Sequence, residues 1–246
     1  FDDRVPEEIN RRIIDHSSTV LMPYTERSRD NLLAEGIDAQ RIFVTGNPIT
    51  EVLNNFSNEI EASDAMERFG VAQFGYFLVT LHRAENTGSR DRLNDIFDGI
   101  SQISAKFDKK VLVSVHPRTA ERLKEFEIGV DAERIVLLEP LGFFDFVNLE
   151  KNALGVLTDS GTVQEECSIF RVPNVTLRDV TERPETIECG SNVLSGADPE
   201  SIVRTTTLAL SHPADWAPPR EYLIENVSQT VCKIVLGYSS IRRHRS

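Results

Sequence analysis

LGVLTDSGTVQEECSIF, residues 154–170, is the stretch of this chain that decides its fold. Residues 154–157 are apolar, as in strands that are buried on both faces of a parallel sheet. Small polar residues follow at 158–162, and residues 163–169 have the spacing of a helix. The first N–H groups of a helix have no partner within the helix, and the helix dipole is positive at that end. The stretch therefore predicts a strand, a turn suited to an anion, and a helix.

The same alternation of apolar runs and amphipathic stretches continues on both sides of this unit. Strands are expected at 41–45, 76–81, 110–115, 134–138, 154–157 and 174–177. Helices are expected at 91–103, 119–126, 144–151, 163–169, 182–189, 199–210 and 221–236. Alternating strands and helices are typical of an α/β fold. Because most of the strands are almost wholly apolar, we expect a Rossmann-like, doubly wound parallel sheet.

A change of composition predicts where the chain is divided. Polar residues interrupt the apolar pattern at 54–66, where we expect a linker. Residues 1–55 would be the remnant of an N-terminal Rossmann-like domain, 56–237 a nearly complete C-terminal one, and 238–246 a solvated tail. Phe1 stands where an initiator Met is expected, and the residues soon after it already resemble the inside of a structured protein. We therefore expect a chain that is truncated at its N-terminus.

Composition and charge exclude several classes of protein. The chain has 246 residues, 40% hydrophobic and 27% charged, as in an ordinary globular protein. Lys and Arg number 27 against 39 Asp and Glu, which gives a net charge of −12. Such a surface repels nucleic-acid phosphates and anionic lipid, so neither nucleic acid nor a membrane is an expected partner. No apolar run reaches the roughly 18 residues that span a bilayer, and we expect a cytoplasmic protein.

The cysteines predict neither a disulfide framework nor a metal site. Cys167, Cys189 and Cys232 are odd in number and have no CxxC spacing. That pattern argues against disulfides and against structural zinc. We expect three reduced thiols, no bound metal and no cofactor.

The turn after the strand at 154–157 is the first candidate for a ligand site. Ser160 and Gly161 precede a helix, where free N–H groups can bind a phosphate. Glu166 follows about one helical turn later, at a distance from which a carboxylate can accept hydrogen bonds from ribose hydroxyls. The alternative is an N-cap serine followed by a solvated acidic face, because Ser-Gly turns before helices are common.

Two histidines follow neighbouring predicted strands. His82 and Arg83 come directly after the strand at 76–81, and His116 follows the strand at 110–115. In open α/β sheets, ligands bind outside the carboxyl ends of the strands. No third ligand has metal spacing, so the pattern favours an anion site over a metal site. The alternative for each histidine is a purely structural hydrogen bond.

Arginines and phenylalanines add two further candidates. Arg178 and Arg183 emerge at the same predicted sheet edge as Ser160, and arginine binds phosphate in a bidentate way. The alternative is a solvated loop that leads into a helix. Among the phenylalanines at 143, 144 and 146, most are expected in the core, while one could face outward and stack on a base.

Blocks along nearly the whole chain carry a resemblance to a known family. They are PEEINR (6–11), VTGNPITEVL (44–53), VTLHRAEN (79–86), the turn at 116–117, LLEPLGFFDFVNL (137–149), LTDSGTVQEE (157–166) and TERPETIECG (181–190). In this order they resemble the UDP-N-acetylglucosamine 2-epimerase family. The resemblance implies the C-terminal half of a glycosyltransferase-B-like two-domain fold. It also implies a non-hydrolysing isomerase that interconverts UDP-N-acetylglucosamine and UDP-N-acetylmannosamine by eliminating UDP to a glycal and adding it back.

The same resemblance implies roles for single residues. The catalytic residues would be His82, beside the diphosphate, Glu7 and Arg11. The UDP-binding residues would be Ser160, Gly161 and Thr162 at the phosphates, Glu166 at the ribose, Phe146 at the uracil, and Arg183. Arg83 and His116 would contact a second, regulatory UDP-N-acetylglucosamine. The full-length protein would be a homodimer that binds a UDP-sugar. The isolated chain would be inactive, because further catalytic carboxylates of the family lie in the preceding domain.

The chain departs from the family pattern around the turn and the helix after it. Thr162 stands where the family has a second glycine, Cys167-Ser168 where Ala-Pro is commoner, and Arg171 where glycine is frequent. The Ser-Gly-Thr turn is similar to that of the family branch that acts on 6-deoxy sugars in the UDP-N-acetyl-L-fucosamine pathway. Which UDP-2-acetamido sugar is the substrate therefore stays open. Three other functions stay open: a UDP-sugar-dependent glycosyltransferase, a hydrolysing epimerase, against which Arg83 and His116 argue, and a nucleotide-binding fragment without turnover.

Overall fold

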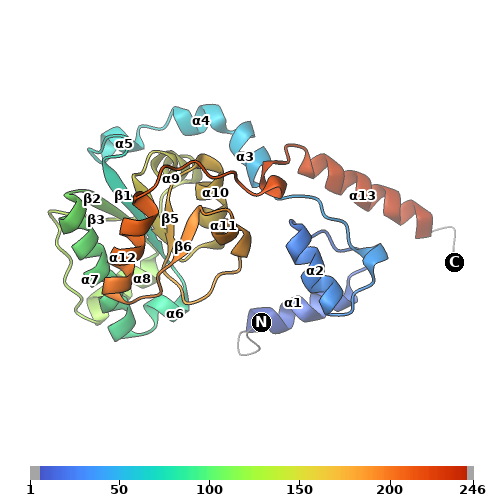
Figure 1. Ribbon diagram of the computed structural model, residues 1–246, viewed down its shortest axis with the longest axis horizontal. Coiled ribbons are helices and arrows are strands. Elements are labelled where there is room, and N and C mark those ends of the chain that lie inside the picture. The colour runs from blue at the N-terminus through green and yellow to red at the C-terminus, as the bar shows by residue number, and fades with distance from the viewer. Residues whose placement is uncertain (1–5, 243–246) are drawn as a thin grey trace. The chain divides into compact units, whose positions relative to one another are not determined.

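The structure is a computed structural model that describes the backbone of residues 6–242 and the side chains of residues 8–238. Contacts divide the chain into two units, Phe1–Leu53 with Arg220–Ser246, and Asn54–Pro219. The second unit contains the sheet (Figure 1). In the described part of the chain no helix is long and apolar enough to cross a membrane.

Within residues 6–242, six parallel strands form one sheet in the order β3-β2-β1-β4-β5-β6. The strands are β1 (Tyr76–Leu81), β2 (Lys110–Val115), β3 (Ile135–Leu138), β4 (Gly155–Thr158), β5 (Asn174–Thr176) and β6 (Asn192–Leu194). This is the strand order of a doubly wound Rossmann sheet, and the order reverses between β1 and β4. The predicted α/β, Rossmann-like fold class is confirmed.

Helices cover both faces of this sheet (Figure 1). The helices of this unit are α4 (Ser57–Glu61), α5 (Ala65–Arg68), α6 (Ala84–Thr87), α7 (Arg90–Phe107), α8 (Pro117–Glu125), α9 (Phe143–Lys151), α10 (Gly161–Phe170), α11 (Pro184–Glu188) and α12 (Pro199–Leu210). Side chains alternate between the faces along β1, because successive residues of a strand point to opposite sides. Phe77 and Val79 join the core under α7 and α12, whereas Tyr76 and Leu78 join the core under α9 and α10. At Gly99 of α7 an added Cβ would lie 2.9 Å from Ile202 of α12, so glycine allows these helices to approach closely.

One strand prediction was wrong, and one strand was missed. Residues 41–45 form no strand; Ile42 makes only an isolated bridge with Leu21. The apolar residues there instead belong to a small core of Leu21, Leu32, Ile37 and Ile42 in the first unit. In the other direction, sequence reasoning missed β6, because it is three residues long and only Asn192 in it is buried.

The segment at 54–66, where a linker was predicted, begins at the contact boundary between Leu53 and Asn54, but it is largely helical and packs on α9. Ile60 of α4 and Ala65 of α5 are buried. Asn148 Nδ2 donates to the Ile60 carbonyl over 2.8 Å, and Ser63 Oγ donates to Asp145 Oδ1 over 2.6 Å. The polar residues that resembled a linker are therefore capping and contact residues of two short helices.

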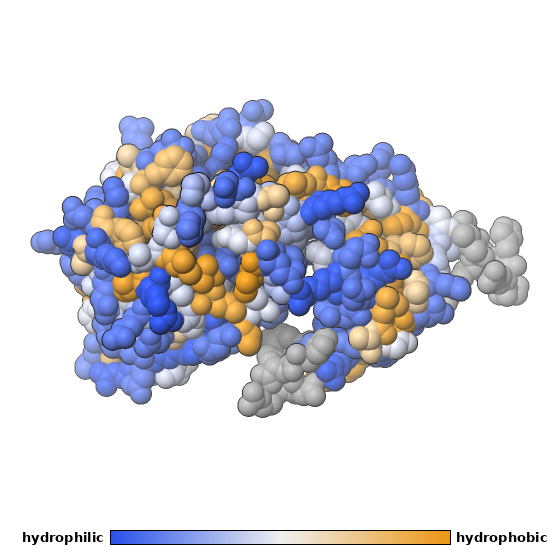
Figure 2. All heavy atoms as spheres, viewed as in Figure 1, coloured by the Kyte–Doolittle hydropathy of each residue, from blue (hydrophilic) through white to orange (hydrophobic). Residues whose placement is uncertain are grey.

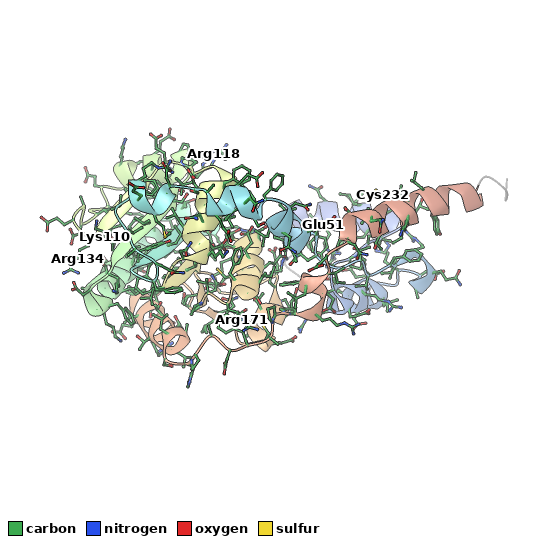
Figure 3. All side chains as sticks on the ribbon, turned by 90° about the horizontal axis from the view of Figure 1, so that it is seen from above. Glu51, Lys110, Arg118, Arg134, Arg171 and Cys232 are labelled. Atoms are coloured by element: carbon green, nitrogen blue, oxygen red, sulfur yellow. The ribbon has the colours of Figure 1, made fainter. Side chains whose placement is uncertain are left out.

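The first unit consists of helices joined by loops: α1 (Pro6–Ser17), α2 (Glu26–Ala34), α3 (Ile49–Asn55) and α13 (Val227–Arg242). The sequence placed 221–236 in the α/β domain, but contacts group these residues with the first unit. Hydrogen bonds explain the difference. Glu51 of α3 accepts from the Ser228 backbone N–H over 2.9 Å at the start of α13, and Asn47 N–H donates to the Glu221 carbonyl over 2.9 Å. Figure 3 labels Glu51 of α3 and Cys232 of α13.

The predicted boundaries near the C-terminus also differ from the structure. The helix expected at 221–236 begins at Val227, after a 3₁₀ turn over Arg220–Leu223, and continues to Arg242. Most of the expected tail at 238–246 is therefore helical, and residues 243–246 lie outside the described part.

Candidate functional site

The candidate site lies at the carboxyl ends of β1 and β4, where the strand order of the sheet reverses. Thr80 of β1 pairs with Thr158 of β4, and their hydroxyl oxygens are 2.6 Å apart. The chain continues from these residues into His82 on one side and Ser160 on the other. The two segments that the sequence singled out separately therefore meet at the crevice where doubly wound sheets bind their ligands.

Asp159 holds His82 at this crevice. The Asp159 carboxylate is fully buried, and its Oδ1 lies 2.9 Å from Nδ1 of His82. Burial opposes ionisation of Asp159, but hydrogen bonds from the His82 side chain and from the backbone N–H groups of Arg83 and His82 keep its pKa below the usual value. An ionised carboxylate only accepts hydrogen bonds, so Nδ1 of His82 carries the proton. Nε2 is then the atom of this half-exposed ring that is left for a ligand.

Further donors complete the shell around Asp159. The Arg83 backbone N–H donates to Oδ2 over 2.9 Å, and Asn86 Nδ2 donates to the same oxygen over 3.1 Å. Asn86 in turn accepts from Arg92 Nε over 2.8 Å. Sequence reasoning did not single out Asp159; an acidic residue directly after an apolar strand is the signal that could have identified it.

The N-terminus of α10 faces the same crevice. Ser160 occupies the N-cap position but makes no side-chain cap, and its backbone N–H donates to Thr158 Oγ1 over 2.9 Å. The N–H groups of the first helical turn are thus not capped by the Ser160 side chain. A Cβ added at Gly161 would lie 3.5 Å from the guanidinium carbon of Arg183, so glycine leaves this corner open beside a cation. Thr162 is exposed at the same helix end.

Arg183 is fixed to α10 by a buried carboxylate. Its Nε donates to Oε1 of Glu165, and its NH1 donates to the Glu182 carbonyl over 3.1 Å. Thr181 Oγ1, two residues earlier, donates to Gln164 Oε1 over 2.7 Å. The loop between β5 and α11 is therefore tied to α10, which holds the Arg183 guanidinium close to the first turn of that helix.

Two further arginines are neutralised by carboxylates. Arg178 is buried, and it contacts Glu85 over 2.7 Å and Glu182 over 3.5 Å. Arg83 NH2 lies 3.7 Å from the same Glu182. Arg178 thus ties the loop after β5 to the loop after β1, which makes it a structural residue of the crevice.

Glu166 is buried on the next turn of α10, with only 4% of its surface exposed. Burial raises its pKa to about 7, a hydrogen bond from Glu150 acts in the opposite direction, and the charge of Glu165 adds to the increase. The predicted ribose carboxylate is therefore not on a solvated acidic face, which was the alternative. Sequence reasoning missed Glu150, although a glutamate within the apolar run of α9 is itself a signal.

His116 follows β2 as predicted and is the N-cap of α8. Its Nδ1 accepts from the Arg118 backbone N–H over 3.3 Å. Val115 before it pairs with Leu81 before His82, so both histidines leave the sheet at the same edge. Arg118 is labelled in Figure 3. Lys110, the first residue of β2, and Arg134, the residue before β3, are also labelled there and lie at the opposite edge of the sheet. The cap gives His116 a structural role, and its predicted ligand role stays a prediction.

The phenylalanines after β3 divide between the core and the surface. Phe146 is half-buried and packs against the core under α9 and α10. Phe143 and Phe144 are about 40% and 38% exposed, and their rings lie 5.8 Å apart. Phe144 also contacts Phe56 at a ring distance of 5.5 Å. The assignment of Phe146 to the uracil stays a prediction.

Glu7 and Arg11 lie on α1, in the first unit. The side chain of Glu7 is outside the described part of the structure. Arg11 is surrounded by carboxylates, at 2.7 Å from Glu8, 2.5 Å from Asp15 and 2.6 Å from Glu35. Its hydrogen bond to Glu8 raises the pKa of the arginine and lowers the pKa of Glu8 to about 2. Arg11 is therefore held firmly in its place on α1.

Comparison with known proteins decides the family. Residues 1–236 match the sequence profile described as UDP-N-acetylglucosamine 2-epimerase. A UDP-N-acetylglucosamine 2-epimerase of Methanocaldococcus jannaschii is 44% identical over 225 residues, which cover 89% of this chain and 62% of that protein. One of Methanococcus maripaludis is 38% identical over 244 residues, which cover 96% of this chain and 66% of that protein. The chain belongs to the UDP-N-acetylglucosamine 2-epimerase family.

Solved structures of this family have the same fold. The crystal structure of the Methanocaldococcus jannaschii epimerase in complex with UDP-GlcNAc and UDP is 41% identical with a TM-score of 0.88, and the match covers 96% of this chain and 66% of that one. The Rickettsia bellii epimerase is 33% identical with a TM-score of 0.89. The wall teichoic acid polymerase TagF, at 13% identity and a TM-score of 0.54, shares the fold alone. The chain thus spans less than two thirds of the length of the relatives it matches.

The groups of the crevice that the structure describes suit an anion better than a metal ion. Among the residues that the structure describes, no group of three His, Cys, Asp or Glu side chains is arranged to hold a metal ion. The Asp159 carboxylate is used in holding His82, and the groups left for a ligand are this histidine, the N-terminus of α10 and the Arg183 guanidinium beside it. These are groups that bind phosphate oxygens.

Proposed function

We propose that this chain provides the UDP-binding unit and the catalytic histidine of an enzyme that interconverts UDP-N-acetylglucosamine and UDP-N-acetylmannosamine. The observation that carries the proposal is the meeting of His82, fixed by Asp159, with the N-terminus of α10 across two adjacent strands. Membership of the 2-epimerase family and the similarity to an epimerase solved with UDP-GlcNAc and UDP support it.

The reaction requires a site that stabilises and retains UDP. Removal of the C2 proton and cleavage of the bond between C1 and the phosphate oxygen leave a C1–C2 double bond and free UDP. UDP then adds back to C1 while a proton returns to C2 from the opposite face. Negative charge grows on the departing diphosphate, and the first N–H groups of α10 and the Arg183 guanidinium are suited to stabilise that charge.

His82 is assigned to the same developing charge. Its Nδ1–H donates to ionised Asp159, so the ring presents Nε2 outward. In its doubly protonated form the ring would donate from Nε2–H to the diphosphate as the C1–O bond breaks. In this assignment Ser160, Gly161 and Thr162 bind the phosphates, Glu166 the ribose and Phe146 the uracil.

Other parts of the proposal concern the remaining predicted residues and the whole protein. Glu7 and Arg11 would act at the sugar, and Arg83 and His116 would contact a regulatory UDP-N-acetylglucosamine. The enzyme would be a cytoplasmic homodimer. Thr162, which replaces a family glycine, is the reason to include other UDP-2-acetamido sugars as candidate substrates.

Two measurements test the function. Isothermal titration calorimetry of the 246-residue chain with UDP tests the nucleotide site. For the second measurement, a protein that contains this chain and has the full length of its relatives is incubated with UDP-N-acetylglucosamine in heavy water. The proton at C2 of the sugar is followed by NMR. We expect UDP binding by the chain and deuterium at C2 in the longer protein. Binding without deuterium incorporation would favour a nucleotide-binding function, and absence of UDP binding would overturn the proposal.

A further inference from the structure

Glu150, on the last turn of α9, is a buried acid outside the residues assigned to the reaction. Its side chain is fully inaccessible to solvent, and its neighbours in the chain, Leu149 and Ala153, belong to the core. Oε1 accepts from the Cys167 thiol over 3.3 Å. Among the described residues no donor reaches Oε2 of Glu150. After burial, the strongest influence on this carboxyl group is Glu166, whose charge and hydrogen bonding both raise the pKa of Glu150.

Two carboxyl groups can form a hydrogen bond with each other only if one of them carries a proton. Burial raises the pKa of Glu150 well above its usual range, and the charge of Glu166 adds to the increase. Glu166 keeps a small exposed area, whereas Glu150 has none. Desolvation disfavours the charged form more strongly at the more buried group, so the proton belongs on Glu150 and the charge on Glu166.

The charged groups on the elements around the pair do not offer Glu150 a cation. Arg183, at the start of α11, is paired with Glu165. Lys151 of α9 contacts Glu61 of α4, and Arg68 of α5 contacts Asp145. β4 and β5 contribute no titratable side chain. The groups that act on Glu150 are Glu166 and the Cys167 thiol, and Glu165 acts on Glu166.

We propose that Glu150 is a positioning residue of the UDP site: as a neutral acid it donates a hydrogen bond to Glu166 and so keeps Glu166 an ionised, correctly oriented acceptor for the ribose hydroxyls. The ribose role of Glu166 rests on the function proposed above, but the protonation of Glu150 does not. The arrangement makes nucleotide binding depend on pH near neutrality, because protonated Glu166 loses acceptor capacity. Cys167 supports the arrangement by donating its thiol proton to the other oxygen of Glu150.

Two substitutions at Glu150 test whether its role is to donate a hydrogen bond to Glu166. Glu150→Gln keeps an N–H donor for Glu166 and an oxygen for the Cys167 thiol, so it should preserve the pH dependence of the wild type. Glu150→Met removes the donor at similar volume. A hydrogen bond to a charged group is worth enough to shift a pKa by roughly one to two units. Glu150→Met should therefore raise the pKa of Glu166 by that amount.

The first experiment observes the carboxyl groups without any ligand. The chain is labelled with ¹³C at the glutamate carboxyl carbons, and Glu150→Gln and Glu166→Gln assign the two signals. We expect the Glu150 carbon to stay at its protonated position from pH 5 to pH 8, while the Glu166 carbon titrates and does so at higher pH in Glu150→Met. A Glu150 carbon that is ionised at pH 7, or an unchanged Glu166 midpoint in Glu150→Met, would overturn the proposal.

The second experiment measures affinity for UDP-N-acetylglucosamine, whose diphosphate does not titrate in this range, by calorimetry between pH 5.5 and pH 9. At pH 7, Glu150→Met should bind about fivefold to fiftyfold more weakly than the wild type, which follows from a shift of about one to two pKa units. Its affinity should recover at pH 9, whereas Glu150→Gln and the exposed control Glu121→Met should match the wild type. Tighter binding by Glu150→Gln at pH 7 would mean that Glu150 is charged and would overturn the proposal. If Glu166→Gln leaves affinity unchanged while the NMR titration is as expected, the proton assignment stands and the ribose function fails.

Discussion

At the scale of single residues, the candidate site consists of side chains whose chemistry is set by a neighbour. His82 takes its tautomer from Asp159, and the pKa of Glu166 is raised by burial and held down by a hydrogen bond from Glu150. Arg183 takes its position from Glu165. These three residues were named from the sequence and their ligand roles stay predictions, while the buried acids beside them became evident only in the structure.

Glu166→Gln should weaken UDP binding and leave the fold intact. The amide still forms a hydrogen bond with Glu150, but the ribose hydroxyls lose a charged acceptor. We expect a loss of about 1 to 3 kcal/mol, or roughly 5- to 150-fold in Kd, by calorimetry at pH 8. Glu121→Gln, an exposed carboxyl on α8, is the matched control. Equal affinities for UDP in the two variants would contradict the ribose assignment.

His82→Ala should separate turnover from binding. The ring is half-exposed, so its removal leaves no cavity, and Asp159 keeps its backbone donors. In a protein of the family's full length, we expect epimerisation to fall by roughly 10²- to 10⁴-fold, as for loss of a proton donor, while UDP affinity changes less than about tenfold. Steady-state assays and calorimetry measure the two effects. His212→Ala, at an exposed histidine, should change neither. A parallel loss of rate and affinity would reduce His82 to a simple binding contact.

At the scale of elements, α9 and α10 are coupled by their buried acids, and this coupling should appear in stability. The folded-state pKa of Glu150 lies above the value of about 4.3 for an unfolded glutamate, so above that pH the folded protein retains a proton that the unfolded chain releases. The free energy of unfolding therefore decreases as pH rises from about 4.3 towards the folded pKa. Glu150→Gln has no such proton and should be more stable than the wild type at pH 8 but not at pH 4. Urea unfolding of the wild type and of Glu150→Gln at the two pH values measures this difference in the free energy of unfolding. The same difference at pH 4 and at pH 8 would contradict a protonated Glu150.

The end of α10 offers a separate test at this scale. Arg171, labelled in Figure 3, is its C-cap and has the left-handed conformation, with φ of 58°. Glycine adopts this conformation without steric cost, and helices commonly end on it. Arg171→Gly should raise the free energy of unfolding by about 0.5 to 1 kcal/mol, measured by urea denaturation. Glu121→Gly, at an exposed position in the right-handed interior of α8, should lower it by about 1 kcal/mol. If Arg171→Gly lowers the free energy of unfolding, the guanidinium makes a contact that stabilises the fold by more than the left-handed backbone costs.

At the scale of the whole molecule, apolar side chains at the surface predict self-association. Figure 2 shows apolar patches between hydrophilic ones on the visible face. On α1, Ile13 and Ile14 are 62% and 60% exposed, and on α13 Leu236 is 71% exposed. Exposed apolar side chains at neighbouring positions favour association. We expect the 246-residue chain to elute as concentration-dependent oligomers in size-exclusion chromatography with light scattering. Ile13→Lys with Ile14→Lys should reduce them, and a monomer at every concentration would contradict the prediction.

The sequence by itself determined most of the elements of the α/β unit. Apolar runs of strand length, helical spacing and the small-residue turn at 158–162 are local patterns, and they predicted β1 to β5, α7 to α10, α12 and the ligand edge. It failed where the signal was weak or ambiguous: β6 is only three residues long, and the polar residues at 54–66 serve helices as well as they would serve a linker.

Only the tertiary structure decided which distant residues meet. His82 and Asp159 are 77 residues apart in the chain and lie side by side because β1 pairs with β4. Glu150 reaches Glu166 because α9 and α10 share one face of the sheet, and residues 221–236 join the first unit because Glu51 binds the start of α13. The physical reason is that local patterns reflect the preferences of neighbouring residues. Strand order, helix packing and the pKa of a buried acid depend on contacts between segments that are remote in sequence.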